Sequence, residues 1–163
     1  MKRSAFVTGA MLLCTALVVL AGAGSVGAST SRALVKTAYN KKIGQKILVD
    51  STGRTLYIFT TDLNGKDTVC TPSGPYGAIC PRVWPALTSA GSPQAGTGAK
   101  ASLLGVYKRS DGKHQVTYNR HPLYYFHGGS GFPAGDEKPG DTHGQGYGKE
   151  WYVLSSKGNP IRK

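Results

Sequence analysis

A Leu-Tyr-x-Phe segment occurs twice in the chain, as Leu56–Phe59 and as Leu123–Phe126. Each copy ends a β-rich stretch, is followed by a long Gly-rich loop, and leads to a piece that contains a tryptophan. A repeated supersecondary unit cannot bury its apolar face alone, so the copies pack on each other around one core. We therefore expect two repeats, about residues 45–98 and 99–158, in one pseudo-symmetric domain.

The first half has the pattern of a β-hairpin. Two β-rich runs, residues 46–49 and 55–60, flank a Ser-Thr-Gly turn centred on Gly53. The Gly- and Pro-rich stretch that follows predicts a long loop, with at most a short helical turn near Trp84. No segment shows a sustained helical period, so the fold class that we predict is all-β.

The second half has the pattern of a three-stranded meander. Runs at residues 104–109, 115–119 and 122–126 are separated by two tight turns, the first at Asp111-Gly112. Another Gly-rich loop then leads to a closing strand that begins at Trp151. The predicted domain therefore consists mainly of antiparallel hairpins and a meander, joined by long Gly- and Pro-rich loops.

Residues 1–28 have the layout of a secretory signal peptide, with a positive start, an apolar run and small residues before the expected cleavage after Ala28. The alternative is a retained anchor helix, because the apolar run at residues 5–23 could just span a bilayer. We expect export from a bacterium and no membrane span in the mature protein. A flexible leader at residues 29–42 is expected to precede a single β domain at 43–163.

The mature chain would be strongly basic. Loss of Lys2 and Arg3 leaves 18 basic and 8 acidic residues, which is a net charge of +10. Such a field attracts anionic surfaces in a salt-sensitive way. The alternative is a solvated surface that keeps the protein soluble.

Two cysteines remain in the predicted mature chain, Cys70 and Cys80 in the segment CTPSGPYGAIC. In an oxidising exterior, an even pair this close predicts a structural disulfide. A metal-thiolate site and a redox pair are the alternatives, although both usually use C-x-x-C spacing.

The two halves also carry longer motifs. Residues 57–62 read Y-x-F-x-x-D, near GRTLY, the cysteine pair and a Trp-Pro step. The second half carries HPLYYF, GDTHGQG at residues 140–146 and WYV at residues 151–153. Over residues 45–158 these motifs resemble a bacterial family described as a secreted repeat of unknown function, or as predicted lipoproteins with a Yx(FWY)xxD motif. The resemblance implies export and a repeated β fold, without an established activity.

The chain departs from this family pattern in two places. Gly129 stands where the second motif would have its acid, and an inserted GGSGFPAG moves the expected counterpart to Asp136. The lipidation cysteine of the lipoprotein members is missing at the end of the signal, which implies a soluble secreted protein.

The aromatic motif allows a structural and a functional interpretation. Tyr57 and Phe59 point to one face of a strand, so they form either core or an aromatic floor. Asp62 either caps the following loop by accepting backbone N–H bonds or adds an acidic edge that suits sugars and cationic ligands. The candidate binding residues are Tyr57, Phe59, Asp62, Tyr124, Phe126, Asp136, Asp141 and Trp151.

A metal site is a second candidate. The loop DEKPGDTHG is dense in possible ligands, and His121 and His127 share one facing if their strand continues that far. Such residues bind Zn²⁺ or Cu²⁺ elsewhere, although turn-forming aspartates and surface histidines need no metal. The candidate ligands are His121, His127, His143, Asp136 and Asp141, and no other cofactor is predicted.

Familiar hydrolase signatures are missing. Residues 128–132 fail the G-x-S-x-G pattern because Phe132 takes the last glycine position, and the chain has no H-E-x-x-H and no P-loop. The sequence therefore favours a non-enzymatic binding or interaction module of the cell envelope or exterior. The expected partner is an anionic cell-wall polymer, a glycan or an envelope protein, and not a specific nucleic acid. A metal-binding or redox-linked extracellular protein is the alternative.

Overall fold

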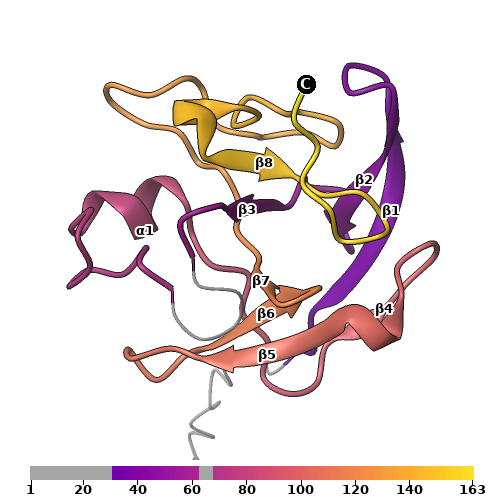
Figure 1. The fold of residues 1–163 in the computed structure, drawn as a ribbon, viewed down its shortest axis with the longest axis horizontal. Coiled ribbons are helices and arrows are strands. Elements are labelled where there is room, and N and C mark those ends of the chain that lie inside the picture. Colours follow the sequence, from indigo (N-terminus) through magenta and orange to yellow (C-terminus); the bar gives the residue numbers. More distant parts are fainter. Residues whose placement is uncertain (1–30, 63–67) are drawn as a thin grey trace, which may run out of the picture.

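The computed structural model describes residues 31–62 and 68–163 (Figure 1). Its buried apolar residues form two clusters. In chain order the elements are β1 (Leu34–Asn40), β2 (Gln45–Asp50), β3 (Tyr57–Phe59), α1 (Ile79–Val83), β4 (Gln94–Ala95), η1 (Ala101–Leu103), β5 (Leu104–Lys108), β6 (His114–Tyr118), β7 (His121–Pro122), η2 (Tyr147–Lys149) and β8 (Trp151–Val153). The strands form three small sheets with the orders β2-β1-β4, β3-β8 and β5-β6-β7. The all-β prediction is confirmed, and α1 ends at the tryptophan where a helical turn was expected.

Residues 34–40, which we expected to lie in a flexible leader, instead form strand β1. This strand pairs antiparallel with β2 over its register from Val35↔Asp50 to Asn40↔Gln45. Only Val35 and Asn40 of this strand are buried. The sequence therefore lacks the alternation of apolar and polar residues by which a half-buried strand is predicted. The turn after β1 is closed by Asn40, whose Oδ1 accepts the Ile43 N–H at 3.0 Å.

The predicted first hairpin is present around its turn, where the Asp50 N–H donates to the Arg54 carbonyl at 2.9 Å and the Leu56 N–H donates to the Leu48 carbonyl at 3.1 Å. The Gly53 N–H donates to the Asp50 carbonyl at 3.1 Å, and an antiparallel bridge joins Val49 to Thr55. Strand β3 then leaves β2 and pairs antiparallel with β8, from Tyr57↔Val153 to Phe59↔Trp151. The first repeat is therefore completed by a strand of the second repeat.

The predicted meander is confirmed, with antiparallel pairing of β5 to β6 and of β6 to β7. The tight turn before β7 places Asn119 and Arg120 at φ 48° and 68°, which is the left-handed region that two-residue hairpin turns use. β7 is shorter than the expected run at residues 122–126. The reason is that Tyr124 forms bridges with Tyr57 and Ala86 instead of continuing along β6.

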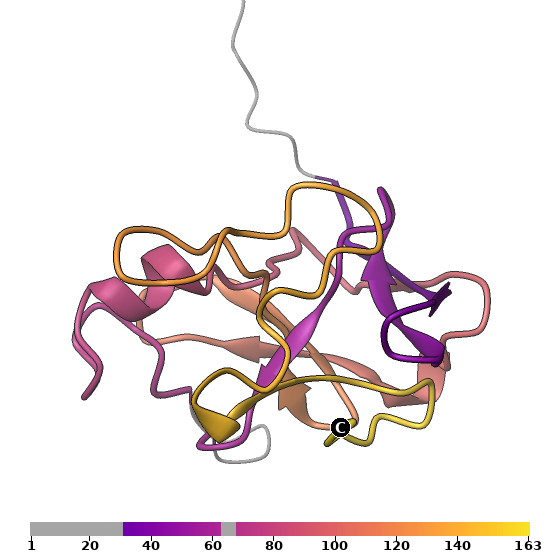
Figure 2. The ribbon, with the colours of Figure 1, turned by 90° about the horizontal axis from the view of Figure 1, so that it is seen from above.

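The two apolar clusters follow the alternation of β3. Tyr57 and Phe59 belong to an aromatic cluster, whereas Leu56 and Ile58 belong to an aliphatic cluster on the other side of the strand. The expectation that Tyr57 and Phe59 share a face is thus confirmed. Helix α1 and the β1–β2 pair lie at opposite ends of the molecule in both views (Figure 1 and Figure 2).

The predicted signal peptide, residues 1–28, lies outside the described residues. Within residues 31–62 and 68–163, none of the helices has the length and apolar character needed to cross a bilayer.

Candidate functional site

The two repeats meet at a pair of tyrosines. The Tyr57 N–H donates to the Tyr124 carbonyl, and the Tyr124 N–H donates to the Tyr57 carbonyl, both at 2.9 Å. These two residues occupy the same position in the repeated Leu-Tyr-x-Phe segment. The reciprocal hydrogen bonds therefore place a local pseudo-two-fold axis between them.

The side chains of these tyrosines exchange partners across this axis. The Tyr57 hydroxyl donates to Asp136 Oδ2 at 2.5 Å, and the Tyr124 hydroxyl donates to Asp62 Oδ2 at 2.6 Å. Each tyrosine thus binds the carboxylate of the other repeat. Asp136 occupies in the second repeat the place that Asp62 has in the first, as the displaced motif suggested.

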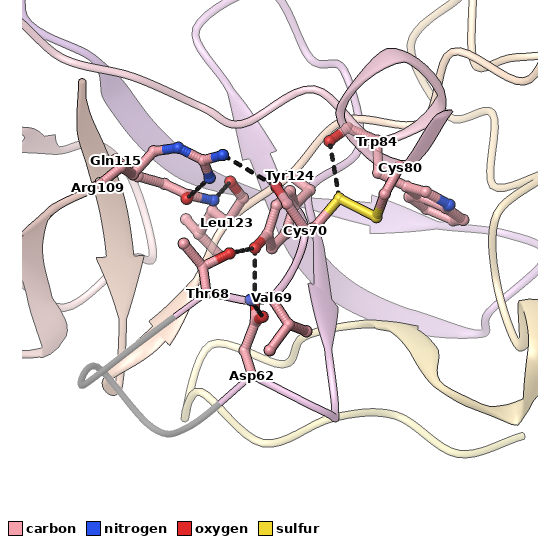
Figure 3. The surroundings of a disulfide bond; sticks show 10 residues. All are labelled: Asp62, Thr68, Val69, Cys70, Cys80, Trp84, Arg109, Gln115, Leu123 and Tyr124. Atoms are coloured by element: carbon pink, nitrogen blue, oxygen red, sulfur yellow. Dashed lines mark hydrogen bonds between the residues drawn. A yellow bond between two sulfur atoms is a disulfide. The ribbon is translucent and has the colours of Figure 1, made fainter. Parts of the chain in front are cut away.

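Each carboxylate also caps a loop of its own repeat. Asp62 Oδ1 accepts the Val69 N–H at 3.0 Å (Figure 3), and Asp136 Oδ1 accepts the His143 N–H at 2.8 Å. In both repeats the donor lies seven residues after the aspartate. The prediction that Asp62 caps the following loop is therefore confirmed, and this cap is repeated at Asp136.

Burial dominates the electrostatics of these pairs. Burial raises the pKa of Asp62 to about 6, against the opposing effect of its hydrogen bonds from Tyr124 and Val69. The pKa of Asp136 is raised for the same reason, while Tyr57 and His143 act in the opposite direction. Burial, followed by the adjacent carboxylate, raises the pKa of both tyrosines well above the ordinary range. The phenols therefore stay protonated and donate to the carboxyl groups.

Aromatic rings stack beside these pairs in a column with the order Phe59, Trp151, Trp84 and Phe126. Successive ring centroids are 4.2, 3.8 and 4.4 Å apart, at interplanar angles of 6°, 4° and 40°. The Tyr124 ring meets Trp151 edge-on at 5.2 Å, and the Tyr57 ring meets Trp84 in the same way at 5.5 Å. Such stacked and T-shaped contacts are favourable aromatic geometries.

Cys70 and Cys80 form the predicted disulfide next to this column. A buried arginine ties the disulfide loop to the meander: Arg109 Nη2 donates to the Cys70 carbonyl at 2.9 Å, and Nη1 donates to Gln115 Oε1 at 2.5 Å (Figure 3). Arg109 also pairs with Asp111 at 3.3 Å. We did not predict this network, because its members are ordinary strand and turn residues in the sequence.

A pocket of about 270 Å³ opens at the side of the aromatic column. Its lining combines six aromatic rings with apolar side chains of α1 and a single charged group, the Glu150 carboxylate. The residues that line it are Phe59, Tyr76, Ile79, Cys80, Val83, Trp84, Phe132, Tyr147, Glu150 and Trp151. The walls of this pocket are therefore mainly aromatic.

Most predicted binding residues do not line this pocket. Tyr57, Asp62, Tyr124, Phe126 and Asp136 are buried in hydrogen bonds and ring contacts. Phe59 and Trp151 do line the pocket. Asp141 is placed elsewhere, where its carboxylate accepts the backbone N–H groups of residues 137 and 138.

The pocket also contains residues that the sequence did not single out. Tyr76 and Phe132 belong to the long Gly- and Pro-rich loops, Tyr147 begins η2, and Glu150 follows η2. In the sequence, the three aromatic residues stand out only because they lie in segments of mostly small residues. Loops bring such residues together only through tertiary packing, so their spacing in the chain carries no pattern.

The proposed metal ligands are not gathered into one cluster. Within residues 31–62 and 68–163, no group of three His, Cys, Asp or Glu side chains is placed to hold a metal ion. His143 Nδ1 lies 3.4 Å from Asp136 Oδ1, which is the one close pair of this set. The strand that carries His121 ends at Pro122, so the shared facing with His127 that we expected does not arise.

The fold and the site define a class of protein: a β domain in which two Leu-Tyr-x-Phe segments are hydrogen-bonded to each other, with a disulfide and an aromatic pocket. Residues 105–155 match the sequence model of the family described as a secreted repeat of unknown function. The matched segment lies within the predicted second repeat and is similar to this family, which indicates an extracellular protein. Comparisons with curated proteins and with solved structures found no match.

Proposed function

We propose that the protein is an extracellular binding module and that the aromatic pocket holds a sugar ring of a cell-envelope polymer. The observation that carries the proposal is the pocket lining, in which six aromatic side chains meet one carboxylate. Aromatic side chains offer large apolar surfaces, and Tyr and Trp add a polar group at one end. A sugar ring needs both, because it has apolar C–H faces and hydroxyl groups around its edge.

The size and rim of the pocket favour a single ring. Its volume of about 270 Å³ lies just below the range of roughly 300–1,000 Å³ that is usual for drug-sized ligands. At the rim, Tyr76 and Ile79 are each 40% exposed. Glu150 Oε1 accepts a hydrogen bond from Thr61 at 3.2 Å, so its second carboxylate oxygen can accept one from a sugar hydroxyl.

The net positive charge of the protein favours an anionic polymer over a neutral one. Among the described residues, Arg109 is the one Lys or Arg side chain within ion-pair distance of a carboxylate. Lys41 and Lys42 lie in the turn after β1, and Lys163 joins them because its Nζ donates to the Ile43 carbonyl at 3.2 Å. Uncompensated positive charge of this kind raises the local concentration of polyanions and speeds their association.

The proposal is tested by fluorescence titration with soluble peptidoglycan fragments and with poly(glycerol phosphate). Both tryptophans of the chain line the pocket, so a bound ring should change the intrinsic emission directly. We expect saturable binding that weakens as salt is added. Tyr76→Ala should weaken it about tenfold, which corresponds to about 1.4 kcal/mol.

The matched control is Tyr39→Ala, which removes an exposed tyrosine from β1, far from α1. This change should leave the affinity unaltered. Absence of any emission change with either polymer at low salt would count against the proposal, as would an equal loss in both variants. The metal- or redox-linked alternative predicts stoichiometric metal or a readily reduced disulfide, which elemental analysis and a free-thiol count can measure on the same preparation.

A further inference from the structure

The aromatic column and the buried tyrosine–aspartate pair have a geometry that ligand binding does not require. We infer that they form a one-electron oxidation site, in which the stacked indoles receive an oxidising equivalent and Tyr124 stores it by passing its proton to Asp62. The oxidant belongs to the class of outer-sphere one-electron oxidants in solution. This inference is independent of the proposed sugar site.

The indoles are placed to accept the oxidising equivalent first. Trp84 and Trp151 line the pocket together with Phe59, and the indoles are the more easily oxidised of these rings, so an oxidant at the pocket takes its electron from them. They stack on each other at 3.8 Å and 4°, which allows both rings to share a positive charge. Phe59 and Phe126 cover their outer faces at 4.2 and 4.4 Å. These covering rings keep water from the faces of an oxidised indole.

Tyr124 is the next ring in the path. It meets Trp151 edge-on at 5.2 Å, with no intervening side chain needed for electron transfer. Its hydroxyl donates to Asp62 Oδ2 at 2.6 Å and also shares a hydrogen bond with Thr68. The phenol therefore has a proton acceptor in place before oxidation begins.

The step balances without a further reactant. The oxidant takes one electron from the indole pair and is itself reduced, which leaves an indole radical cation. That radical cation takes one electron from Tyr124, and the pair of indoles is restored. The phenolic O–H bond breaks, an O–H bond forms at Asp62 Oδ2, and the products are a neutral phenoxyl radical and a carboxylic acid.

The burial of Tyr124 and Asp62 favours transfer of the proton from the phenol to the carboxylate. Tyr124 is fully buried and Asp62 is 5% exposed, so the ionised carboxylate sits in a poorly solvated place. The transfer converts a neutral phenol and a charged carboxylate into two neutral groups, and it removes a charge that burial disfavours. The raised pKa of Asp62 reports the same tendency to take up a proton.

A second tyrosine–aspartate pair, Tyr57 with Asp136, lies beside the indoles, and the experiment must remove its contribution. Tyr57 meets Trp84 at 5.5 Å and donates to Asp136 at 2.5 Å, so it can accept the oxidising equivalent in the same way. Every variant is therefore built on Tyr57→Phe, which keeps the ring contact and leaves Tyr124–Asp62 as the tyrosine–aspartate pair beside the indoles. A third pair, Tyr125 with Asp50 at 3.0 Å, is present in every variant. This Tyr57→Phe protein is the parent of the series.

The experiment is flash oxidation of the full chain with photogenerated tris(bipyridine)ruthenium(III), followed by time-resolved absorption of indole and phenoxyl radicals. In the parent, the indole radical should decay as the phenoxyl radical forms. Tyr124→Phe should lengthen the lifetime of the indole radical by about tenfold or more, and Asp62→Asn, which keeps the phenol, should slow the transfer by a similar factor.

The matched control is Tyr118→Phe. Tyr118 is also fully buried, but among the described residues its hydroxyl has hydrogen bonds with the Lys100 N–H and the Ser156 carbonyl and with no carboxylate. This variant should behave as the parent does. An unchanged rate in Asp62→Asn, or equal indole lifetimes in the parent and Tyr124→Phe, would show that the inference is wrong.

The inference can still be tested on the wild-type protein if a variant fails to fold. Wild-type protein that yields no phenoxyl radical after indole oxidation overturns the inference by itself. For wild type that does form the radical, transfer must be slower in D₂O, because the phenolic proton moves with the electron. The absence of a solvent isotope effect would contradict proton transfer to Asp62.

Discussion

Replacement of Asp62 by asparagine should remove a specific part of the pH dependence of stability. The pKa of this carboxyl is about 6 in the fold, against an ordinary value of 3.8. Between these pH values the folded chain binds a proton that the unfolded chain does not. Protonation therefore stabilises the fold, fully below the ordinary value, and this stabilisation is lost as the pH rises through the folded pKa.

The magnitude follows from the size of the shift. A shift of roughly two pKa units at about 1.4 kcal/mol each corresponds to about 3 kcal/mol. The asparagine side chain is neutral at every pH, so Asp62→Asn should lack this contribution. The asparagine oxygen can still accept the Val69 N–H, which Asp62 Oδ1 accepts at 3.0 Å in the wild type, and this keeps the loop cap in place.

The assay is urea denaturation of both proteins between pH 4.5 and 8, followed by tryptophan emission. Other carboxyls also titrate, since the pKa of Asp136 is raised and those of Asp111 and Asp141 are lowered. The informative quantity is therefore the difference in unfolding free energy between wild type and Asp62→Asn. We expect this difference to move in favour of the wild type by about 2 kcal/mol as the pH falls from 8 to 4.5, since the full contribution is reached only below the ordinary pKa of 3.8. A difference that does not change with pH would refute the reasoning.

Two further perturbations test the packing around the column. Replacing Cys70 and Cys80 by serine should lower the unfolding free energy by about 2–3 kcal/mol, because a short closed loop is released. Urea titration of both proteins, with and without reductant, measures this loss. The prediction is contradicted if the double variant loses no more stability than reductant alone removes from that variant, which has no disulfide. Gly144→Ala would bring its Cβ to 2.6 Å from the Trp84 ring, so we expect a destabilisation of about 1–3 kcal/mol. Gly91→Ala is its control, since its Cβ meets only Arg32 at 3.7 Å or more and should change the melting temperature little; equal effects of the two changes would contradict the packing argument.

The sequence by itself determined the local structure of this protein. Alternation along residues 56–59 set which side chains share a face, because successive residues of a strand point to opposite sides. The turn before β7 and the meander followed from turn residues between β-rich runs. The spacing of Cys70 and Cys80 likewise predicted their disulfide. Each of these features depends on residues close together in the chain.

The pairing partners of the strands were determined by the tertiary structure. A period of two places a side chain on a face but does not say which strand lies alongside, so β3 was expected beside β2 and pairs with β8 instead. β1 escaped prediction for a related reason, since few of its side chains are buried. Long-range pairing depends on how whole segments pack, which a local pattern does not contain.

The candidate site was likewise decided by tertiary structure. The motif identified Tyr57, Asp62, Tyr124 and Asp136 as related residues, but not that each tyrosine binds the aspartate of the other repeat. That exchange arises because the repeats meet about a pseudo-two-fold axis, which brings residues from distant parts of the chain into one buried hydrogen-bond network. The pocket has the same origin, because its walls come from β3, α1, two loops and β8, which meet only when the repeats close on each other.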